Sequence, residues 1–249
     1  MELTFTPANV SWKRPKSEYK KMVHEFLNYV KNPNYTVEKS TLTLQNKIAS
    51  IKQLLKFKLS ILPILLLLIV IAKRLTGAES VEWDKNWTNY FIIVAFAPIF
   101  EELTFRYALR FSKTAIAIML IMVVWLIARF TVKSNQDIAL IVGIAFALIP
   151  AIRIAIKPFG NQLEEQWIRF FPFIFHFSAI TFGLMHLMNF EHINNYFLAI
   201  PLVSSQLVSG YVLGFTRMKF GLIYSMGLHA VWNFITSLPI LIMLISKLF

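Results

Sequence analysis

Two adjacent glutamates and an arginine interrupt an apolar stretch that runs from Tyr90 to Phe111. Ionisable groups inside a bilayer cost roughly 2.5–3.5 kcal/mol each on insertion scales, so they persist where they are paired and used. Glu102 and Arg106 stand four residues apart and can pair along one helix face. Glu101 lies about 100° around the helix from Glu102 and has no such partner, which leaves its carboxylate available as a general base. An ion-pair network that only holds helices together is the alternative.

Two later apolar stretches carry a histidine paired with a residue four positions away. FGLMH places Phe182 and His186 on one helix face, and HAVWN does the same for His229 and Asn233. A histidine beside a carboxylate can activate a water, and two converging donors can stabilise an oxyanion. Each pair alone fits a polar clamp between helices. The three motifs together indicate amide hydrolysis without a nucleophilic side chain, whereas His176, which lacks such a pattern, is predicted to be structural or close to the lipid.

The composition predicts a membrane protein. Of the 249 residues, 57% are hydrophobic and only 15% are charged, whereas about a quarter of the residues in soluble domains are charged. The absence of cysteine excludes disulfides and cysteine-ligated metals. The net charge is +12, and eleven of the 25 Lys and Arg residues lie in residues 1–58. This distribution favours cytoplasmic flanks next to anionic lipid over a nucleic-acid partner.

Apolar runs of about 20 residues predict an all-α fold with about seven to eight transmembrane helices. Pro98 lacks an N–H and should loosen the helix before the glutamates, and Pro239 should kink the last run or divide it in two. Because the N-terminal region is basic, we expect a multi-pass protein of the cell membrane with a cytoplasmic N-terminus. The seven expected spans are 57–73, 88–110, 112–130, 137–156, 169–189, 195–216 and 220–247.

Residues 1–56 are predicted to form a cytoplasmic region ahead of a transmembrane domain at 57–249. A first helix begins near Ser17, and LTLQNKIASIKQLLKFK then predicts a basic amphipathic helix. This helix is expected either on the membrane surface or packed on the protein. In the sixth span, Gly210 and Gly214 form a small-xxx-small pattern that permits close helix packing.

The motifs resemble those of a known family. EELTFR, FGLMH and HAVWN, in this order and in separate spans, are similar to the EExxxR, FxxxH and HxxxN motifs of the CPBP family. This family comprises the CAAX prenyl protease type II and bacteriocin-processing proteases and is also called the ABI family. The stretch GYVLGFTRMKFGLIYSMGLHAVWNF resembles the closing segment of the family. The resemblance covers roughly residues 88–237 and implies an all-helical intramembrane endopeptidase.

By this resemblance, each motif residue acquires an expected role. Glu101 would activate the attacking water, and Glu102 and His186 would bind and orient it. His229 and Asn233 would form the oxyanion site. The two supporting residues would be Arg106, which orders the glutamates, and Phe182, which packs the site.

We expect catalysis without a cofactor, by a water that a glutamate activates. The alternative is a divalent metal such as zinc, for which Glu101, Glu102, His186 and His229 would be suitable ligands. The expected partner is a peptide or protein substrate at the membrane, either lipidated or a leader peptide. Two other functions use the same polar residues: a non-catalytic membrane immunity or scaffold protein, and a proton-coupled transporter.

Two features depart from the expected pattern. Eighty residues separate Arg106 from His186, so residues 112–156 are predicted to be an inserted helical hairpin. Two additional crossings preserve the relative direction of the motif helices. The predicted span boundaries also place Glu101 in the inner half of its span but His186 near the outer end of its own, so the helices must shift or tilt for these groups to meet.

Overall fold

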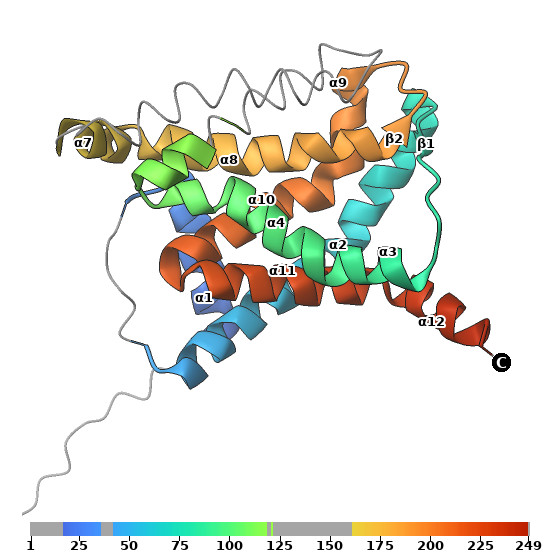
Figure 1. Cartoon of the computed structure of the whole chain (residues 1–249), viewed down its shortest axis with the longest axis horizontal. Helices are drawn as coiled ribbons and strands as arrows, with labels where there is room; N and C mark the ends of the chain where they lie inside the picture. Colours follow the sequence, from blue (N-terminus) through green and yellow to red (C-terminus); the bar gives the residue numbers. More distant parts are fainter. Residues whose placement is uncertain (1–16, 36–41, 119–120, 122–160, 249) are drawn as a thin grey trace, which may run out of the picture.

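The computed structural model describes residues 17–35, 42–118, 121 and 161–248, and this part of the chain is mostly helical (Figure 1). The α-helices are α1 (Glu18–Lys31), α2 (Leu44–Thr76), α3 (Trp87–Phe91), α4 (Ala97–Phe105), α7 (Asn161–Arg169), α8 (Phe171–Met185), α9 (Tyr196–Ala199), α10 (Ser204–Lys219), α11 (Leu222–Thr236) and α12 (Leu238–Ser246). Short connecting elements are the π-helix η1 (Ile92–Phe96), the 3₁₀-helices η2 (Tyr107–Leu109), η3 (His186–Asn189) and η4 (Ile200–Val203), and the strands β1 (Glu79–Ser80) and β2 (Phe190–Glu191).

The predicted amphipathic helix and the predicted first span form one continuous helix, α2. The Thr43 side chain accepts a hydrogen bond from the Asn46 N–H at its start, and Gly77, with φ 68°, ends it in the left-handed conformation. Pro63 lies inside the helix without ending it. The expected start of the first span, residue 57, lies inside this continuous helix, and the division between a cytoplasmic region and a transmembrane domain at that residue stays a prediction. The basic half of α2 packs its apolar face, including Leu54, on the protein core.

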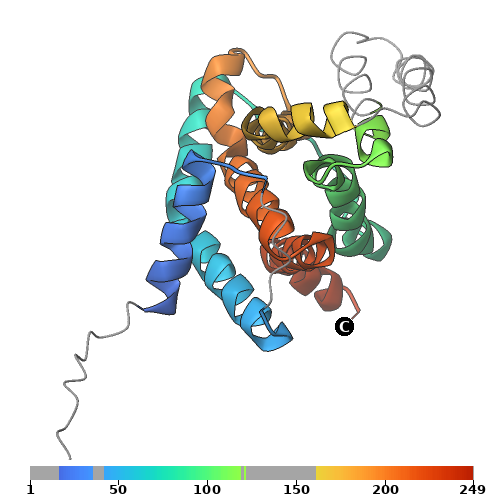
Figure 2. The same cartoon turned by 90° about the vertical axis from the view of Figure 1, so that its left-hand side faces the viewer.

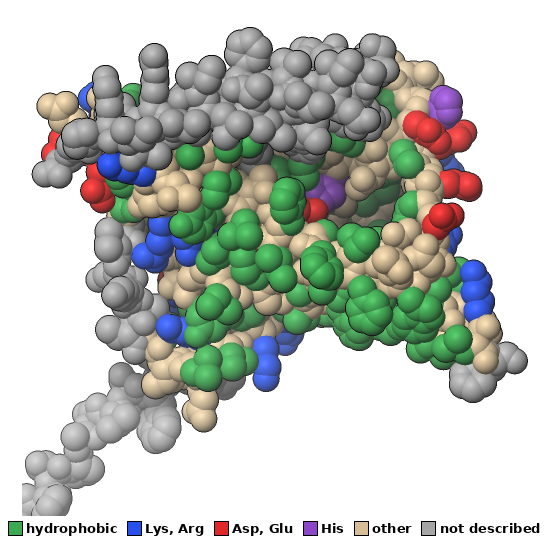
Figure 3. Space-filling model, viewed as in Figure 1, with side chains coloured by type: hydrophobic (Ala, Val, Ile, Leu, Met, Phe, Trp, Pro, Cys, Tyr) green, Lys and Arg blue, Asp and Glu red, His purple; other side chains and the backbone are tan. Residues whose placement is uncertain are grey.

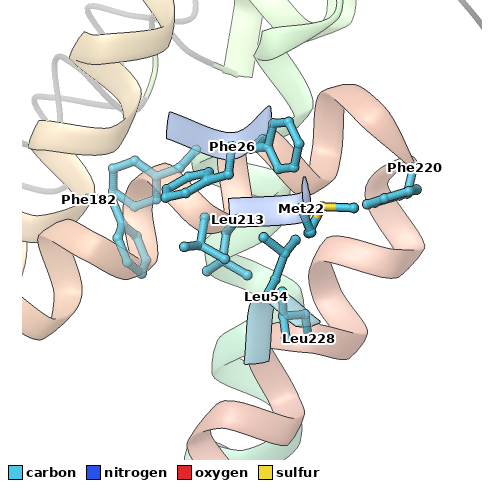
Figure 4. Close-up of a cluster of buried hydrophobic side chains, with 10 residues drawn as sticks. Met22, Phe26, Leu54, Phe182, Leu213, Phe220 and Leu228 are labelled. Carbon is cyan, nitrogen blue, oxygen red and sulfur yellow. The ribbon is translucent and has the colours of Figure 1, made fainter. Parts of the chain in front are cut away.

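α1 joins this core instead of standing apart from the membrane domain. Met22 and Phe26 are buried against Leu54 of α2 and Leu213 of α10, and Phe182 of the FGLMH motif belongs to the same cluster (Figure 4). Phe26 contacts the Phe215 ring edge-on at a centroid distance of 5.6 Å. The N-terminal helix is therefore packed on the same cluster of side chains that supports a candidate site residue.

The expected span 88–110 is broken into a series of short helices. In an α-helix, residue 98 would donate an N–H to the carbonyl four residues earlier, but Pro98 has none. The backbone instead adopts the π-helix η1 directly before α4, with the Ala97 N–H bonded to the Ile92 carbonyl. The glutamates lie in α4, and Arg106 follows its end. Most of the expected spans 112–130 and 137–156, and hence the hairpin at 112–156, lie outside the described residues.

Within the described residues, three helices are long and apolar enough to cross a membrane: Leu44–Thr76, Phe171–Asn189 and Tyr196–Lys219. α11 and α12 together make a fourth candidate span, bent by 54°. The break predicted near Pro239 is confirmed, because Pro239 lies in the first turn of α12. The fold is that of a helical membrane protein, and the number of seven to eight spans stays a prediction.

One small sheet departs from the all-α expectation. β1 and β2 pair as an antiparallel ribbon with Glu79 opposite Glu191. The ribbon lies where α2 and η3 end, and the Asn194 N–H also bonds to the Thr76 carbonyl. These backbone bonds join the far end of α2 to the end of the α8 segment.

α10 occupies the centre of the described helices and contacts α1, α2, α8 and α11 (Figure 2). The predicted close packing at its glycines is confirmed. A Cβ atom added at Gly210 would lie 2.5 Å from the Ala179 carbonyl oxygen of α8, and one added at Gly214 would lie 2.9 Å from the Phe175 ring. Because glycine has no side chain, α8 and α10 can approach each other closely at these two positions.

Replacing Gly210 by alanine should lower the free energy of unfolding by about 1–3 kcal/mol, because the backbone of α8 must move away. Gly227 of α11 is the matched control, since a Cβ added there meets nothing within 4 Å. Gly227→Ala should be neutral, or stabilising by up to about 1 kcal/mol. Thermal unfolding of the purified variants in detergent measures both effects. Equal unfolding temperatures would contradict the close packing.

Candidate active site

α4 packs against both α8 and α11, and this contact brings the three sequence motifs together. Figure 3 shows a hollow on this face of the molecule, below α8, in which a histidine and an acidic side chain are visible. Glu102, His229 and Phe182 are buried, whereas Glu101, His186 and Asn233 are partly exposed. The polar residues predicted from the sequence thus lie between helices that face one another.

Glu102 is held by several partners. Its side chain is 0% exposed, and Oε1 lies 3.4 Å from Arg106 Nη1 and 3.1 Å from His229 Nδ1. Oε2 accepts a hydrogen bond from the Ser225 hydroxyl. Both carboxylate oxygens therefore have partners, so the Glu102 side chain is held in one position.

Glu101 differs from its neighbour in having no fixed partner on one oxygen. Its side chain is 19% exposed, and the closest ionisable contact of Oε2 is His229 Nε2 at 3.6 Å, beyond hydrogen-bonding distance. Oε2 is buried and has no hydrogen-bond partner in the described structure. Of the two glutamates, Glu101 is therefore the one with an oxygen available for proton transfer.

His229 lies between the two glutamates. Nδ1 faces Glu102 and Nε2 faces Glu101. Because an ionised Glu102 carboxylate can only accept, Nδ1 carries a proton and Nε2 is directed towards the second carboxylate. This arrangement fixes the orientation of the imidazole ring.

His186 is oriented by its own helix. Its Nδ1 lies 2.8 Å from the Phe182 carbonyl oxygen, which can only accept, so Nδ1 donates and Nε2 is free. The Phe182 ring contacts both histidine rings edge-on, with centroid distances of 4.9 Å to His186 and 5.7 Å to His229. The Phe182 ring therefore lies between the two histidines, and the difference in depth expected between Glu101 and His186 stays a prediction.

Arg106 is completely buried at 0% exposure. Its guanidinium lies over the Phe182 ring at 3.8 Å and pairs with Glu102. Nε of Arg217 donates to the Arg106 carbonyl at 3.1 Å, which fixes the end of α4 against α10. Both supporting residues predicted from the sequence therefore contact each other and the site.

Asn233 contacts the π-helix. Its Nδ2 donates to the Ile93 carbonyl oxygen at 3.0 Å, where the backbone departs from α-helical geometry. The amide nitrogen has two hydrogens, so one donor remains for another acceptor. His176, by contrast, lies 3.3 Å from the Tyr211 hydroxyl and contacts none of the motif residues in the described structure.

Sequence reasoning missed two residues of the site. Ser225 lies four residues before His229, and this helical spacing would have placed it on the same face. Lys58 lies in α2 at 1% exposure, with its Nζ 3.8 Å from the Trp232 ring of α11. The sequence groups Lys58 with the basic flanking residues, because every charged residue before it in the amphipathic half of the helix is also a lysine.

The described residues also contain one group whose metal-ligating atoms lie within 4.8 Å of one another, namely Glu79, Glu191 and His192 at the exposed β1–β2 ribbon. The predicted metal ligands do not form such a group in the described structure: their ligand atoms do not all lie within 4.8 Å of one another. These residues are Glu101, Glu102, His186 and His229. The nitrogens and oxygens of that set are nevertheless of the types that bind zinc.

Comparison with known proteins gives one family match. Residues 83–235 match the family described as type II CAAX prenyl endopeptidase Rce1-like. Comparisons with curated proteins and with solved structures found no match. The matched range contains all three motifs and the π-helix.

Proposed function

Because the chain belongs to the type II CAAX prenyl endopeptidase Rce1-like family, we propose that it is an intramembrane endopeptidase that uses Glu101 to activate a water. The family is one of CAAX-type intramembrane proteases. The observation that supports the mechanism most strongly is the difference between the two glutamates. Glu102 forms an ion pair with Arg106 and hydrogen bonds with His229 and Ser225, whereas Oε2 of Glu101 has no hydrogen-bond partner in the described structure.

In the proposed reaction, Glu101 removes a proton from a water while the water oxygen bonds to the carbonyl carbon of the substrate. The carbonyl electron pair moves to its oxygen and gives a tetrahedral oxyanion. Glu101 holds this proton on its carboxyl group, and Nε2 of His229 lies 3.6 Å from Glu101 Oε2. When the C–N bond breaks, this proton passes to the leaving amine, and the Glu101 carboxylate is regenerated.

Three side chains are assigned to the water and the oxyanion. Nε2 of His186 has a free lone pair, because Nδ1 is bonded to the Phe182 carbonyl, and can accept a hydrogen bond from the water. Protonated His229 and the second amide hydrogen of Asn233 supply the donors for the oxyanion. Glu102 holds the His229 ring in the orientation that this role needs.

We propose that no metal takes part. A zinc ion would need three ligands here, and Glu101, His186 and His229 have free donor atoms of the right chemistry. The ligand atoms of these three residues, however, do not all lie within 4.8 Å of one another, as those of Glu79, Glu191 and His192 do. This favours a water bound directly by Glu101 and His186.

The metal-free proposal predicts that activity survives chelation. A purified sample treated with a zinc chelator should cleave peptides at the untreated rate, and elemental analysis should find less than one zinc per chain. Loss of activity on chelation, with recovery on adding zinc, would show instead that a metal is required.

The substrate is proposed to be a peptide that reaches the site at the membrane, either lipidated or a leader peptide. A panel of fluorogenic peptides of both kinds, offered to the enzyme in liposomes, tests this proposal. Cleavage of the lipidated peptides alone would assign the lipid-dependent class, and cleavage of the leader peptides alone would assign the other. Cleavage of neither, by an enzyme whose helical content is intact, would support the alternative of a non-catalytic binding protein.

A further inference from the structure

The backbone carbonyl of Ile93 is left without a donor from its own helix. In the π-helix η1, the Ala97 N–H bonds to the Ile92 carbonyl, five residues earlier. The next bond in this register would join the N–H of residue 98 to the Ile93 carbonyl, but residue 98 is proline and has no N–H. An acceptor away from water costs free energy unless another donor satisfies it. Pro98 therefore creates one open acceptor in the segment that precedes the glutamates.

Asn233 of α11 supplies the missing donor. Its Nδ2 lies 3.0 Å from the Ile93 carbonyl oxygen. Carbonyls inside a regular helix are occupied by the helix itself, and a side chain from a neighbouring helix bonds to one most readily where the ladder is interrupted. The place at which Asn233 contacts this segment is therefore determined by the position of Pro98.

This hydrogen bond is one of two points at which α11 holds the segment that carries the glutamates. One turn earlier on α11, His229 lies 3.1 Å from Glu102 Oε1 and 3.6 Å from Glu101 Oε2. Ile93, which receives the bond from Asn233, precedes Glu101 by eight residues. Contacts at two separate points fix both the rotation of a helix and its position along its neighbour.

Glu101 depends on this backbone geometry more than Glu102 does. Its Oε2 is buried and has no hydrogen-bond partner in the described structure, so the helix that carries it must set its position. A π-helix takes more residues into each turn than an α-helix, in which one residue turns the chain by about 100°. If residues 92–96 returned to α-helical geometry, Ile93 would rotate relative to Glu101, and both contacts with α11 could not be kept.

On this basis we propose that Pro98 is a positioning residue: by leaving the Ile93 carbonyl to Asn233, it fixes the rotation of α4 and hence the place of Glu101 against α11. Any other residue at position 98 would bring an N–H that competes for this carbonyl or restores the α-helical register. The kinetic part of this inference rests on the proposed function, whereas the coupling between Pro98 and Asn233 concerns the folded protein alone.

Pro98→Ala tests the kinetic part, because it restores the N–H. Pro172→Ala is the matched control, since Pro172 is exposed in the first turn of α8, where a backbone N–H has no partner in the helix. In liposomes, Pro98→Ala should lower kcat about 100-fold with KM unchanged, because a displaced base slows the reaction without weakening binding. Its unfolding temperature should stay within about 5 °C of wild type, and Pro172→Ala should keep the wild-type kcat. A wild-type kcat in Pro98→Ala, or a change confined to KM, would overturn the positioning role.

A thermal-unfolding cycle tests the coupling without any substrate. Asn233→Leu leaves the Ile93 carbonyl without a donor and should lower the unfolding temperature by about 4 °C or more. In the Pro98→Ala background the restored N–H can serve this carbonyl, so Asn233→Leu should cost less than half as much there.

The outcomes of the cycle separate this inference from the proposed function. If Asn233→Leu alone does not fold, folding of the double variant shows the same coupling. Equal losses in both backgrounds, or failure of both variants to fold, would overturn the proposal. Coupling found in a protein without peptidase activity would reject the proposed function and leave the pairing of Pro98 with Asn233 standing.

Discussion

Arg106→Met is expected to be the most destabilising single substitution at the site. The guanidinium is 0% exposed and is the permanent cation paired with Glu102, which is itself 0% exposed. Removing one partner of a buried pair leaves an uncompensated charge and typically costs about 3–5 kcal/mol. The variant should therefore unfold at a markedly lower temperature in detergent and lose its activity.

Two further variants separate charge from packing at this position. Arg106→Lys keeps the charge but loses the planar group that lies over the Phe182 ring at 3.8 Å, so its unfolding temperature should fall between those of Arg106→Met and wild type. Arg74→Met, at an exposed position of α2, should have the same unfolding temperature as wild type. An Arg106→Met protein as stable as wild type would show that Glu102 is not held by this pair.

Glu101→Gln is expected to have the largest effect on activity and almost none on stability. The amide has nearly the same shape but cannot take a proton from water, so the cleavage rate should fall by about 10³-fold or more. Because Oε2 of Glu101 has no hydrogen bond to lose, the unfolding temperature should stay within about 2 °C of wild type.

Glu102→Gln is the informative comparison for this prediction. Its carboxylate contacts Arg106, His229 and Ser225, so the amide should lower both the unfolding temperature and the activity. Both isosteric changes should therefore lower activity, but only Glu102→Gln should lower the unfolding temperature. If Glu101→Gln is destabilised and Glu102→Gln is not, the assigned roles are reversed.

The motif residues could be predicted from sequence because helical spacing decides which side chains share a face. Phe182 with His186, and His229 with Asn233, follow from a separation of four residues. The close contact at Gly210 follows from the small-xxx-small pattern that it forms with Gly214. Such predictions need only the geometry of one helix at a time.

Contacts between helices could not be predicted in the same way. Which nitrogen of His229 faces which glutamate depends on the rotation and depth of α4 and α11, and no single-helix pattern contains that information. Pro98 predicted a loosened helix near the π-helix, but the hydrogen bond from Asn233 to the Ile93 carbonyl could not be predicted. Lys58 was missed because a lysine next to other lysines is usually a solvated flank, and only the packing of α2 reveals that it is buried.

The continuity of α2 shows how a change in composition can be mistaken for a boundary. Its first half is basic and amphipathic and its second half is apolar, which suggested a surface helix followed by a span. Pro63 lies inside the helix without ending it, and the capping residues Thr43 and Gly77 lie at the two outer ends. Capping signals would therefore have predicted the helix better than hydropathy did.

The most direct test of the central claim is mass spectrometry of a peptide incubated with the purified protein in liposomes, comparing wild type with Glu101→Gln. The account predicts that wild type produces two fragments from one internal peptide bond, with one oxygen from water in the new carboxyl group. It predicts that Glu101→Gln, although folded, leaves the peptide intact. The same fragments at the same rate from both proteins would contradict the assignment of Glu101 as the base that activates water.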